Sequence, residues 1–205
     1  MNIFISLVAL LIAVVLHEYS HGWVAERFGD PTARLAGRLT LNPLAHLDPL
    51  GSVILPLIFI LTGLPGFGWA KPVPVNFQAL RNPKRDMIWV ALAGPLTNII
   101  LALIASILLR IGIINPSSLL ETLLVNIVII NLILAIFNLV PIPPLDGSRI
   151  VMGILPASIA YRYSKLEPIG FFIVIFLLYI GFLSGFILPI VYSLVRLFLG
   201  RGFGI

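Results

Sequence analysis

Long apolar stretches alternate with short polar connections along this chain, a pattern typical of membrane-spanning helices. Residues 3–16 are apolar apart from Ser6, and polar residues continue on helical spacing until Gly29-Asp30-Pro31 ends the run. At about 20 residues per membrane-spanning helix, three later stretches are also long enough to cross a bilayer: 87–109, 119–140 and 169–199. We therefore expect helices over residues 2–27 and over these stretches. The last one could hold one tilted helix or two, and Gly185 and Pro189 favour a break there.

The region between the first two stretches has a different pattern. Residues 50–64 are apolar, but the run is short for a membrane span and contains Gly51, Pro56 and Gly63. Residues 65–77 are rich in proline and glycine, with Val73 and Val75 alternating, which favours an extended strand or loop over a helix. We expect a re-entrant or hairpin segment around residues 50–77.

The composition supports a membrane protein. Of the 205 residues, 60% are hydrophobic and 10% are charged, whereas a soluble domain is typically about 45–50% apolar and about 25% charged. We predict an all-α polytopic membrane protein, with a bundle of about four to six transmembrane helices in a single domain over residues 1–205. It would lie in the lipid bilayer of the cell membrane.

Charge and cysteine content narrow the chemistry further. The formal net charge is +5, but the basic residues lie in loops between apolar runs, which indicates orientation by the positive-inside rule and no nucleic-acid partner. The chain contains no cysteine. This absence excludes disulfides, cysteine-ligated metals and thiol nucleophiles.

The polar end of the first helix carries an H-E-x-x-H motif, His17-Glu18-Tyr19-Ser20-His21. Positions i and i+4 share one face of a helix, so both imidazoles can bind one metal ion, and Glu18 can act as general base on a metal-bound water. Zinc favours such nitrogen ligands. The alternative is a solvated cluster at the membrane interface, a position that also suits Tyr19 and Trp23.

A catalytic zinc site needs a third protein ligand. The only further histidine is His46, and Asp146 is the best-placed carboxylate, because prolines end the preceding apolar stretch and let its side chain turn inward. Taken alone, Asp146 is more simply interpreted as a loop aspartate after a proline turn.

Three motifs together resemble one known family. They are His17-Glu-Tyr-Ser-His21, Ala93-Gly94-Pro95-Leu-Thr-Asn98 and Asn138-Leu-Val-Pro-Ile-Pro-Pro-Leu-Asp146-Gly147. In order, they resemble the motifs of the site-2 proteases, intramembrane zinc metalloproteases that cut membrane-spanning protein substrates within or near the bilayer. This chain looks like a compact prokaryotic branch, without room for a PDZ or CBS domain.

The resemblance also assigns roles to individual residues. It implies that His17, His21 and Asp146 hold Zn²⁺ and that Glu18 is the general base on a zinc-bound water. Asn138 resembles the family asparagine that binds substrate or steadies the oxyanion. The catalytic core would cover about residues 8–154, followed by C-terminal membrane segments at about 167–200.

His46 allows three interpretations. It could act behind the ligands or as a gate, with its ring oriented by nearby Asp48, which is the interpretation that we favour. It could be a fourth ligand, or it could be an ordinary loop residue. A catalytic zinc keeps an open position, which argues against a fourth ligand.

Metal binding constrains the topology, because Asp146 must reach the depth of His17 and His21. It does so if residues 50–64 do not cross the bilayer. Residues 87–109 then cross away from the side on which the first helix ends, and residues 119–140 cross back to that side. The basic loops at 27–38, 71–85 and 149–165 fall on the same side, which the positive-inside rule places in the cytoplasm. We therefore expect the active site toward the cytoplasmic side.

Two other classes of protein would use the same ligands. A non-proteolytic membrane metal-binding protein or transporter would need further polar residues along a path through residues 169–199, which has almost none. A scaffold holding zinc for structure alone would not need Glu18. We therefore favour the protease.

Overall fold

The computed structural model describes residues 3–54, 57–58, 61, 68–112, 114–115 and 118–200, and within them it contains helices and no β-strand. The α-helices are α1 (Ile3–Arg27), α2 (Thr32–Leu35), α4 (Pro83–Arg110), α5 (Leu119–Asn138), α6 (Asp146–Ile154), α7 (Ala157–Ser164), α8 (Glu167–Tyr179) and α9 (Leu188–Leu199). Shorter 3₁₀ and π turns are η1 (Pro43–His46), η2 (Pro49–Ile54), η3 (Phe77–Ala79) and η4 (Leu183–Ile187).

Three of the described helices are long and apolar enough to cross a membrane: α1, α4 and α5. The bent pair formed by α8 and residues Leu183–Leu199 would make a fourth span. The all-α membrane architecture is confirmed, at the lower end of the expected number of spans.

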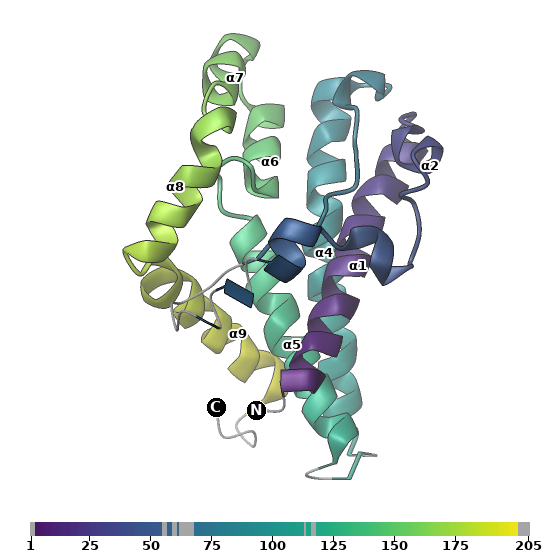
Figure 1. The fold of residues 1–205 in the computed structure, drawn as a ribbon, viewed down its shortest axis with the longest axis vertical. Coiled ribbons are helices and arrows are strands. Elements are labelled where there is room, and N and C mark those ends of the chain that lie inside the picture. Colours follow the sequence, from purple (N-terminus) through teal and green to yellow (C-terminus); the bar gives the residue numbers. More distant parts are fainter. Residues whose placement is uncertain are drawn as a thin grey trace.

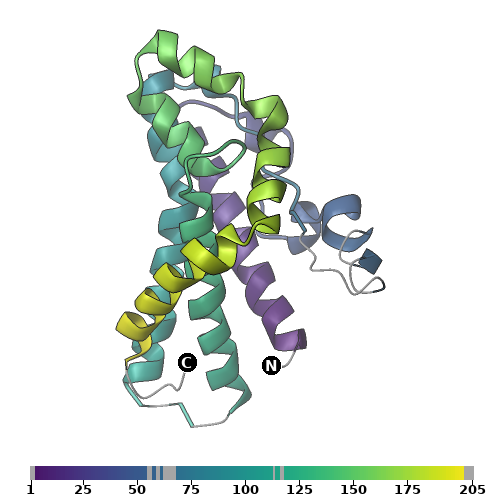
Figure 2. The same ribbon diagram turned by 90° about the vertical axis from the view of Figure 1, so that its left-hand side faces the viewer.

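Helix α4 is the centre of the bundle and packs against both α1 and α5 (Figures 1 and 2). Many of its buried positions are small, among them Ala91, Gly94, Ala102 and Ala105. Small residues let helix backbones approach closely, which is how membrane helices gain van der Waals contact without a hydrophobic driving force.

The end of the bundle away from α2 is closed by an apolar cluster. Helix α9 runs across α5 and α4 there (Figure 2). The buried members of this cluster are Ala102, Ala105, Leu109, Leu124, Val128, Leu132, Ile187, Val191, Val195 and Leu199.

The connection between α1 and α4 returns to the end from which it leaves. The backbone N–H of Arg81 donates to the carbonyl of Phe28 at 2.9 Å, so the two ends of residues 29–80 meet. A single crossing of the bilayer within this connection does not fit that geometry. Residues 55–56, 59–60 and 62–67 of the predicted re-entrant segment lie outside the described residues, so its full path is not described.

Two boundaries differ from the predictions. Helix α4 begins at Pro83, earlier than expected, with Pro83 in its first turn and buried Asp86 accepting from the Asn82 backbone N–H at 2.8 Å. The break expected within residues 169–199 is present as a bend of 70°, but the favoured position near Gly185 and Pro189 is wrong. It lies at Gly181, whose φ of 84° is in the left-handed region that glycine adopts without steric cost.

Candidate metal centre

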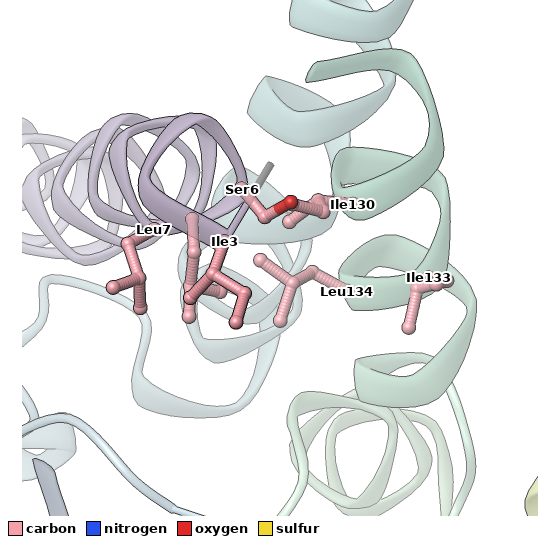
Figure 3. Close-up of a pocket in the computed structure, with 7 residues that line it drawn as sticks. Ile3, Ser6, Leu7, Ile130, Ile133 and Leu134 are labelled. Atoms are coloured by element: carbon pink, nitrogen blue, oxygen red, sulfur yellow. The ribbon is translucent and has the colours of Figure 1, made fainter. Parts of the chain in front are cut away.

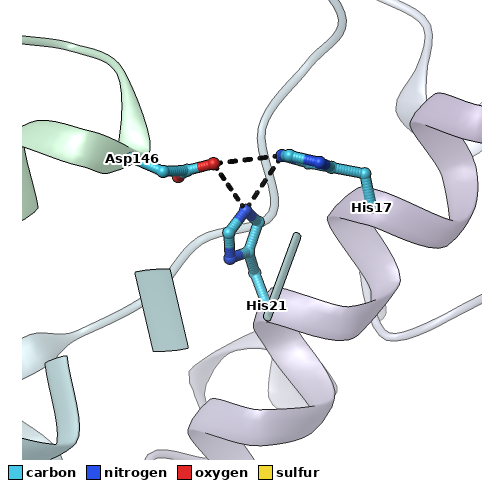
Figure 4. A group of neighbouring side chains, drawn as sticks. All are labelled: His17, His21 and Asp146. Atoms are coloured by element: carbon cyan, nitrogen blue, oxygen red, sulfur yellow. Dashed lines mark hydrogen bonds and ion pairs between the residues drawn. The ribbon is translucent and has the colours of Figure 1, made fainter. Parts of the chain in front are cut away.

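Three side chains that are far apart in the sequence meet at one point. His17 and His21 lie on successive turns of α1, and Asp146 is the first residue of α6 (Figure 4). The Nε2 atoms of the two histidines are 3.0 Å apart. Asp146 Oδ2 lies 3.2 Å from His17 Nε2 and 3.3 Å from His21 Nε2. Among the described residues, these three form a group able to hold a metal ion, the candidate metal-binding group.

The spacing of these atoms fits zinc. Bonds of about 2.0–2.1 Å in a tetrahedral site place neighbouring ligand atoms roughly 3.3–3.4 Å apart. The observed separations of 3.0, 3.2 and 3.3 Å are close to that edge. Two imidazoles and one carboxylate also leave the fourth position open, as a catalytic zinc site requires.

The outer nitrogens of both rings have hydrogen-bond acceptors. His21 Nδ1 donates to the carbonyl of Val90 at 2.7 Å, and His17 Nδ1 faces Asn98 Oδ1 at 2.5 Å. A neutral imidazole that donates through Nδ1 carries its lone pair on Nε2. Both lone pairs therefore point at the common centre, where only a cation or a proton can relieve their repulsion.

Gly94 lets α4 approach the two rings. A Cβ atom on Gly94 would overlap His21 Nε2 and the His17 ring. This contact explains why a glycine stands at this position of α4, four residues after Val90.

Asp146 is delivered by the turn that joins α5 to α6. A Cβ atom on Gly147 would overlap the carbonyls of Leu139 and Val140, so α6 begins directly against the end of α5. Tyr163 Oη donates to the carbonyl of Pro141 at 2.6 Å and ties the same turn to α7. The proline-rich motif therefore bends the chain back toward α1.

Burial by itself raises the pKa of the Asp146 carboxyl, but the nearby His21 and His17 outweigh it and hold this pKa below its ordinary value. Asp146 is consequently an anion at neutral pH. Two imidazole nitrogens and one carboxylate oxygen make a donor set suited to a divalent cation.

Glu18 follows the first histidine and is held by the backbone of another segment. The Val73 N–H donates to Glu18 Oε2 at 2.7 Å, while Glu18 Oε1 makes no hydrogen bond to the described residues. One oxygen thus orients the carboxylate and the other is available for a water molecule. The carboxylate is half-buried.

The segment around Val73, residues 71–76, is extended and is anchored by groups outside it. The Lys71 N–H donates to the carbonyl of His46 at 2.9 Å, and Arg38 donates to the Lys71 carbonyl at 2.9 Å. At the other end, the Asn76 N–H donates to the fully buried Asp30 at 2.6 Å. These contacts replace the strand pairing that an isolated extended segment would need.

His46 and Asn138 lie outside the group of three. His46 is buried and donates through Nε2 to the carbonyl of Thr40 at 2.8 Å. The expectation that Asp48 orients this ring is wrong, because Asp48 instead accepts from the N–H groups of Leu50 and Gly51. Asn138, the last residue of α5, donates one amide hydrogen to the carbonyl of Leu134 at 3.0 Å.

An apolar pocket of about 310 Å³ opens between α1 and α5 (Figure 3). Its only polar side chain is Ser6, which donates to Asn126 Oδ1 at 3.0 Å. The pocket is lined by Ile3, Ser6, Leu7, Leu10, Ile130, Ile133 and Leu134. It contains none of the metal-binding group, so the chemistry lies elsewhere on α1.

Three contributors to the centre were not predicted: the acceptor role of Asn98, the close approach of Gly94 and the Val73 N–H. The available signal was the motif Ala93–Asn98 itself, since an amide in an apolar span needs a partner. Nothing in the sequence indicates which backbone N–H meets Glu18.

Comparison with known proteins finds a matching family and several relatives. The model of peptidase family M50 matches residues 5–114 and 110–181. YwhC of Bacillus subtilis, provisionally named a zinc metalloprotease, is 37% identical over 183 residues, which cover 85% of this chain and 80% of YwhC. Rip2 of Mycolicibacterium smegmatis, named in the same provisional way, is 31% identical over 193 residues, 93% of this chain and 73% of Rip2.

A zinc metalloprotease of Methanocaldococcus jannaschii, MJ0392, is 27% identical over 189 residues, which cover 91% of this chain and 45% of that protein. No solved structure matches the chain significantly. The family match extends over most of the sequence and includes all three motifs. The chain therefore belongs to peptidase family M50, the site-2 proteases, and is a zinc metalloprotease.

Proposed function

We propose that this zinc metalloprotease hydrolyses peptide bonds of membrane-spanning proteins within or near the bilayer. The observation that carries the proposal is the place of the metal-binding group on a membrane-spanning helix. His17 lies about 21 Å along α1 from Ile3, at about 1.5 Å per residue, and the hydrocarbon core is about 30 Å thick. A soluble substrate would have no reason to meet a site at that depth.

In this proposal His17, His21 and Asp146 hold zinc, and Glu18 is the general base. Zinc, when bound, polarises the scissile carbonyl and makes water more acidic. Glu18, fixed at Oε2 by the Val73 N–H, takes a proton from the attacking water at Oε1. It then returns that proton to the leaving amine.

The substrate must change conformation to react. In a helix each scissile carbonyl is hydrogen-bonded to an N–H four residues later, so a membrane-spanning substrate has to unwind locally before attack. Asp146 and Glu18 are each half-buried, so we expect water to reach the site past their exposed atoms. The catalytic core would span about residues 8–154, followed by C-terminal membrane segments at about 167–200.

The active site faces the cytoplasm in this proposal. Basic residues gather at the end of the bundle where α1 ends and α4 begins, and Arg110 and Arg196 lie toward the other end. Exposed members of the first group include Arg27, Arg34, Arg81, Lys84 and Arg85. The positive-inside rule places that end in the cytoplasm.

The general-base role is tested with Glu18→Gln. We expect zinc content of about one per chain and an unchanged fold, with loss of cleavage by roughly 10²–10⁴-fold, because the amide cannot accept the proton. The assay is cleavage of single-span membrane proteins co-expressed in the same membrane, and the trapped substrate is identified by crosslinking to the variant.

Glu26→Gln is the matched control, because Glu26 is the other glutamate of α1 and pairs with Arg34 at the surface. It should cleave like the wild type. Cleavage by Glu18→Gln within a factor of about ten of wild type contradicts the assignment, given the size expected for a lost general base. Zinc binding without any cleavage by the wild type would instead favour a non-proteolytic metal-binding protein.

The ligand assignment has its own test. His17→Ala, His21→Ala and Asp146→Asn should each lose stoichiometric zinc, measured by elemental analysis of purified protein. Asp146→Asn is the sharpest, since it keeps the shape of the side chain and removes only its charge. Full metal content in any of the three rules out that residue as a ligand.

A further inference from the structure

Two fully buried amides lie behind the metal-binding group. Asn98 on α4 and Asn131 on α5 have no exposed surface, although both belong to membrane-spanning helices. A buried amide in an apolar span is unfavourable unless its donors and acceptors are satisfied.

The orientation of each amide follows from a backbone carbonyl, which can only accept. Asn131 Nδ2 donates to the carbonyl of Ile127 at 2.8 Å, so Asn131 Oδ1 must face the other way, toward α4. There it accepts from Asn98 Nδ2 at 2.6 Å. Asn98 Nδ2 also lies 3.4 Å from the carbonyl of Ala13.

Because the amino group of Asn98 already donates to Asn131, its Oδ1 faces His17 Nδ1 at 2.5 Å. His17 must then donate through Nδ1, which leaves the Nε2 lone pair for the metal. His21 needs no such relay, because its Nδ1 donates directly to the carbonyl of Val90. The two histidines therefore have the same tautomer fixed in different ways, one by backbone and one by two side-chain amides.

We infer that Asn131 is a positioning residue for the metal centre, acting through Asn98 to hold His17 in the tautomer that binds zinc. The inference rests on the proposed role of His17 as a ligand. Without the Asn131 acceptor, the Asn98 amide is free to rotate and offer Nδ2 to His17, which favours the tautomer whose Nε2 carries a hydrogen and cannot bind metal.

The chain supplies a matched control in Asn126. It is also buried on α5, it donates Nδ2 to the carbonyl four residues earlier, Thr122, and it accepts from a neighbouring helix through Ser6. In the described part of the chain it makes no hydrogen bond to His17, His21 or Asp146. Asn126→Leu and Asn131→Leu thus remove equivalent local interactions and differ only in the link to His17.

The measurement is zinc affinity of the full-length protein in detergent, by competition with a chelator. Asn131→Leu should weaken zinc binding by about 10-fold and Asn98→Leu by about 10–100-fold, the range seen when groups behind metal ligands are lost. Asn126→Leu should stay within about 2-fold of wild type, well below that range. The Asn98→Leu/Asn131→Leu double variant should equal Asn98→Leu alone, because Asn131 acts only through Asn98.

Nitrogen-15 NMR of histidine in the zinc-free protein gives a second readout, and with three histidines in the chain the spectrum is simple. His17 should be the Nδ1–H tautomer in the wild type and in Asn126→Leu, and a mixture in Asn131→Leu. Equal zinc affinities for Asn131→Leu and Asn126→Leu, or additive losses in the double variant, would overturn the relay. Undiminished zinc binding by His17→Ala would instead overturn the ligand assignment on which it rests.

Discussion

Gly94 is the residue at which a single added carbon should disturb the metal centre most directly. Its Cα faces the two imidazoles, and a Cβ there would overlap atoms of both rings. Interior packing tolerates little added volume, since neighbouring groups must move to accommodate it. A membrane helix usually tolerates alanine well, so the effect of this substitution would be specific to the site.

We predict that Gly94→Ala weakens zinc affinity by at least about 10-fold, the scale on which misoriented metal ligands lose affinity. Gly185→Ala is the control, because Gly185 is also helical and a Cβ there meets no atom within 4 Å. Chelator competition on both variants measures the effect. Equal zinc affinities for the two variants would show that the rings move aside at no cost.

The sequence predicts some parts of this site well and others not at all. The i, i+4 spacing of His17 and His21 follows from helix geometry alone, and the structure does bring Asp146 to them, although their separate roles stay predictions. The partner of His17 was not predictable, because Asn98 meets it only through the packing of α4 on α1. The prediction that Asp48 orients His46 is wrong for the same reason, because residues close in the sequence need not be in contact in the structure.

At the scale of elements, the extended segment 71–76 connects the loop around His46 to Glu18, the proposed general base. His46 holds its own loop through Thr40 and receives the Lys71 N–H on its carbonyl, and Val73 two residues later holds Glu18. His46 is thus linked to Glu18 by backbone, without being part of the metal-binding group. This placement favours a positioning role over that of a fourth ligand.

We predict that His46→Leu keeps zinc at about one per chain and lowers turnover by about 10-fold, comparable to the loss of a group behind a metal site. His46→Gln should recover most of the activity, because its side-chain amide can still donate to the Thr40 carbonyl. Zinc content and turnover of both variants are measured together. Loss of zinc in His46→Leu would indicate a ligand, and unchanged values for both would indicate an ordinary loop residue.

The long helices were predictable because each needs an uninterrupted apolar run, and α1, α4 and α5 agree with those runs within a few residues. The ends of these helices were less predictable from the sequence. Pro83 and Asp86 start α4 inside a basic stretch that reads as a loop, and the break at Gly181 depends on a left-handed φ that any of the C-terminal glycines could have adopted.

For the whole molecule, zinc should act as a brace between the first and last parts of the catalytic core, since it would join α1 to α6. A ligand that binds only the folded state stabilises it by about 2.7 kcal/mol when present at 100 times its Kd. We predict that chelation lowers the thermal midpoint of the wild type and leaves that of Asp146→Asn unchanged. An equal response of the two proteins to chelator would mean that the stabilising metal binds elsewhere.

The orientation in the membrane can be tested on the same scale, because the chain has no native cysteine. Ala36, Gln78 and Lys165 are exposed near the end that carries the metal-binding group, and Asn115 is exposed at the other end. With the Phe28–Arg81 contact closing residues 29–80, single cysteines at the first three positions should react with an impermeant maleimide only after the cells are opened. Asn115→Cys should react in intact cells.

Labelling of Ala36→Cys and Gln78→Cys from opposite faces would require residues 50–64 to cross the bilayer. Reaction of all four positions in the reverse pattern would keep the fold and place the active site outside the cytoplasm.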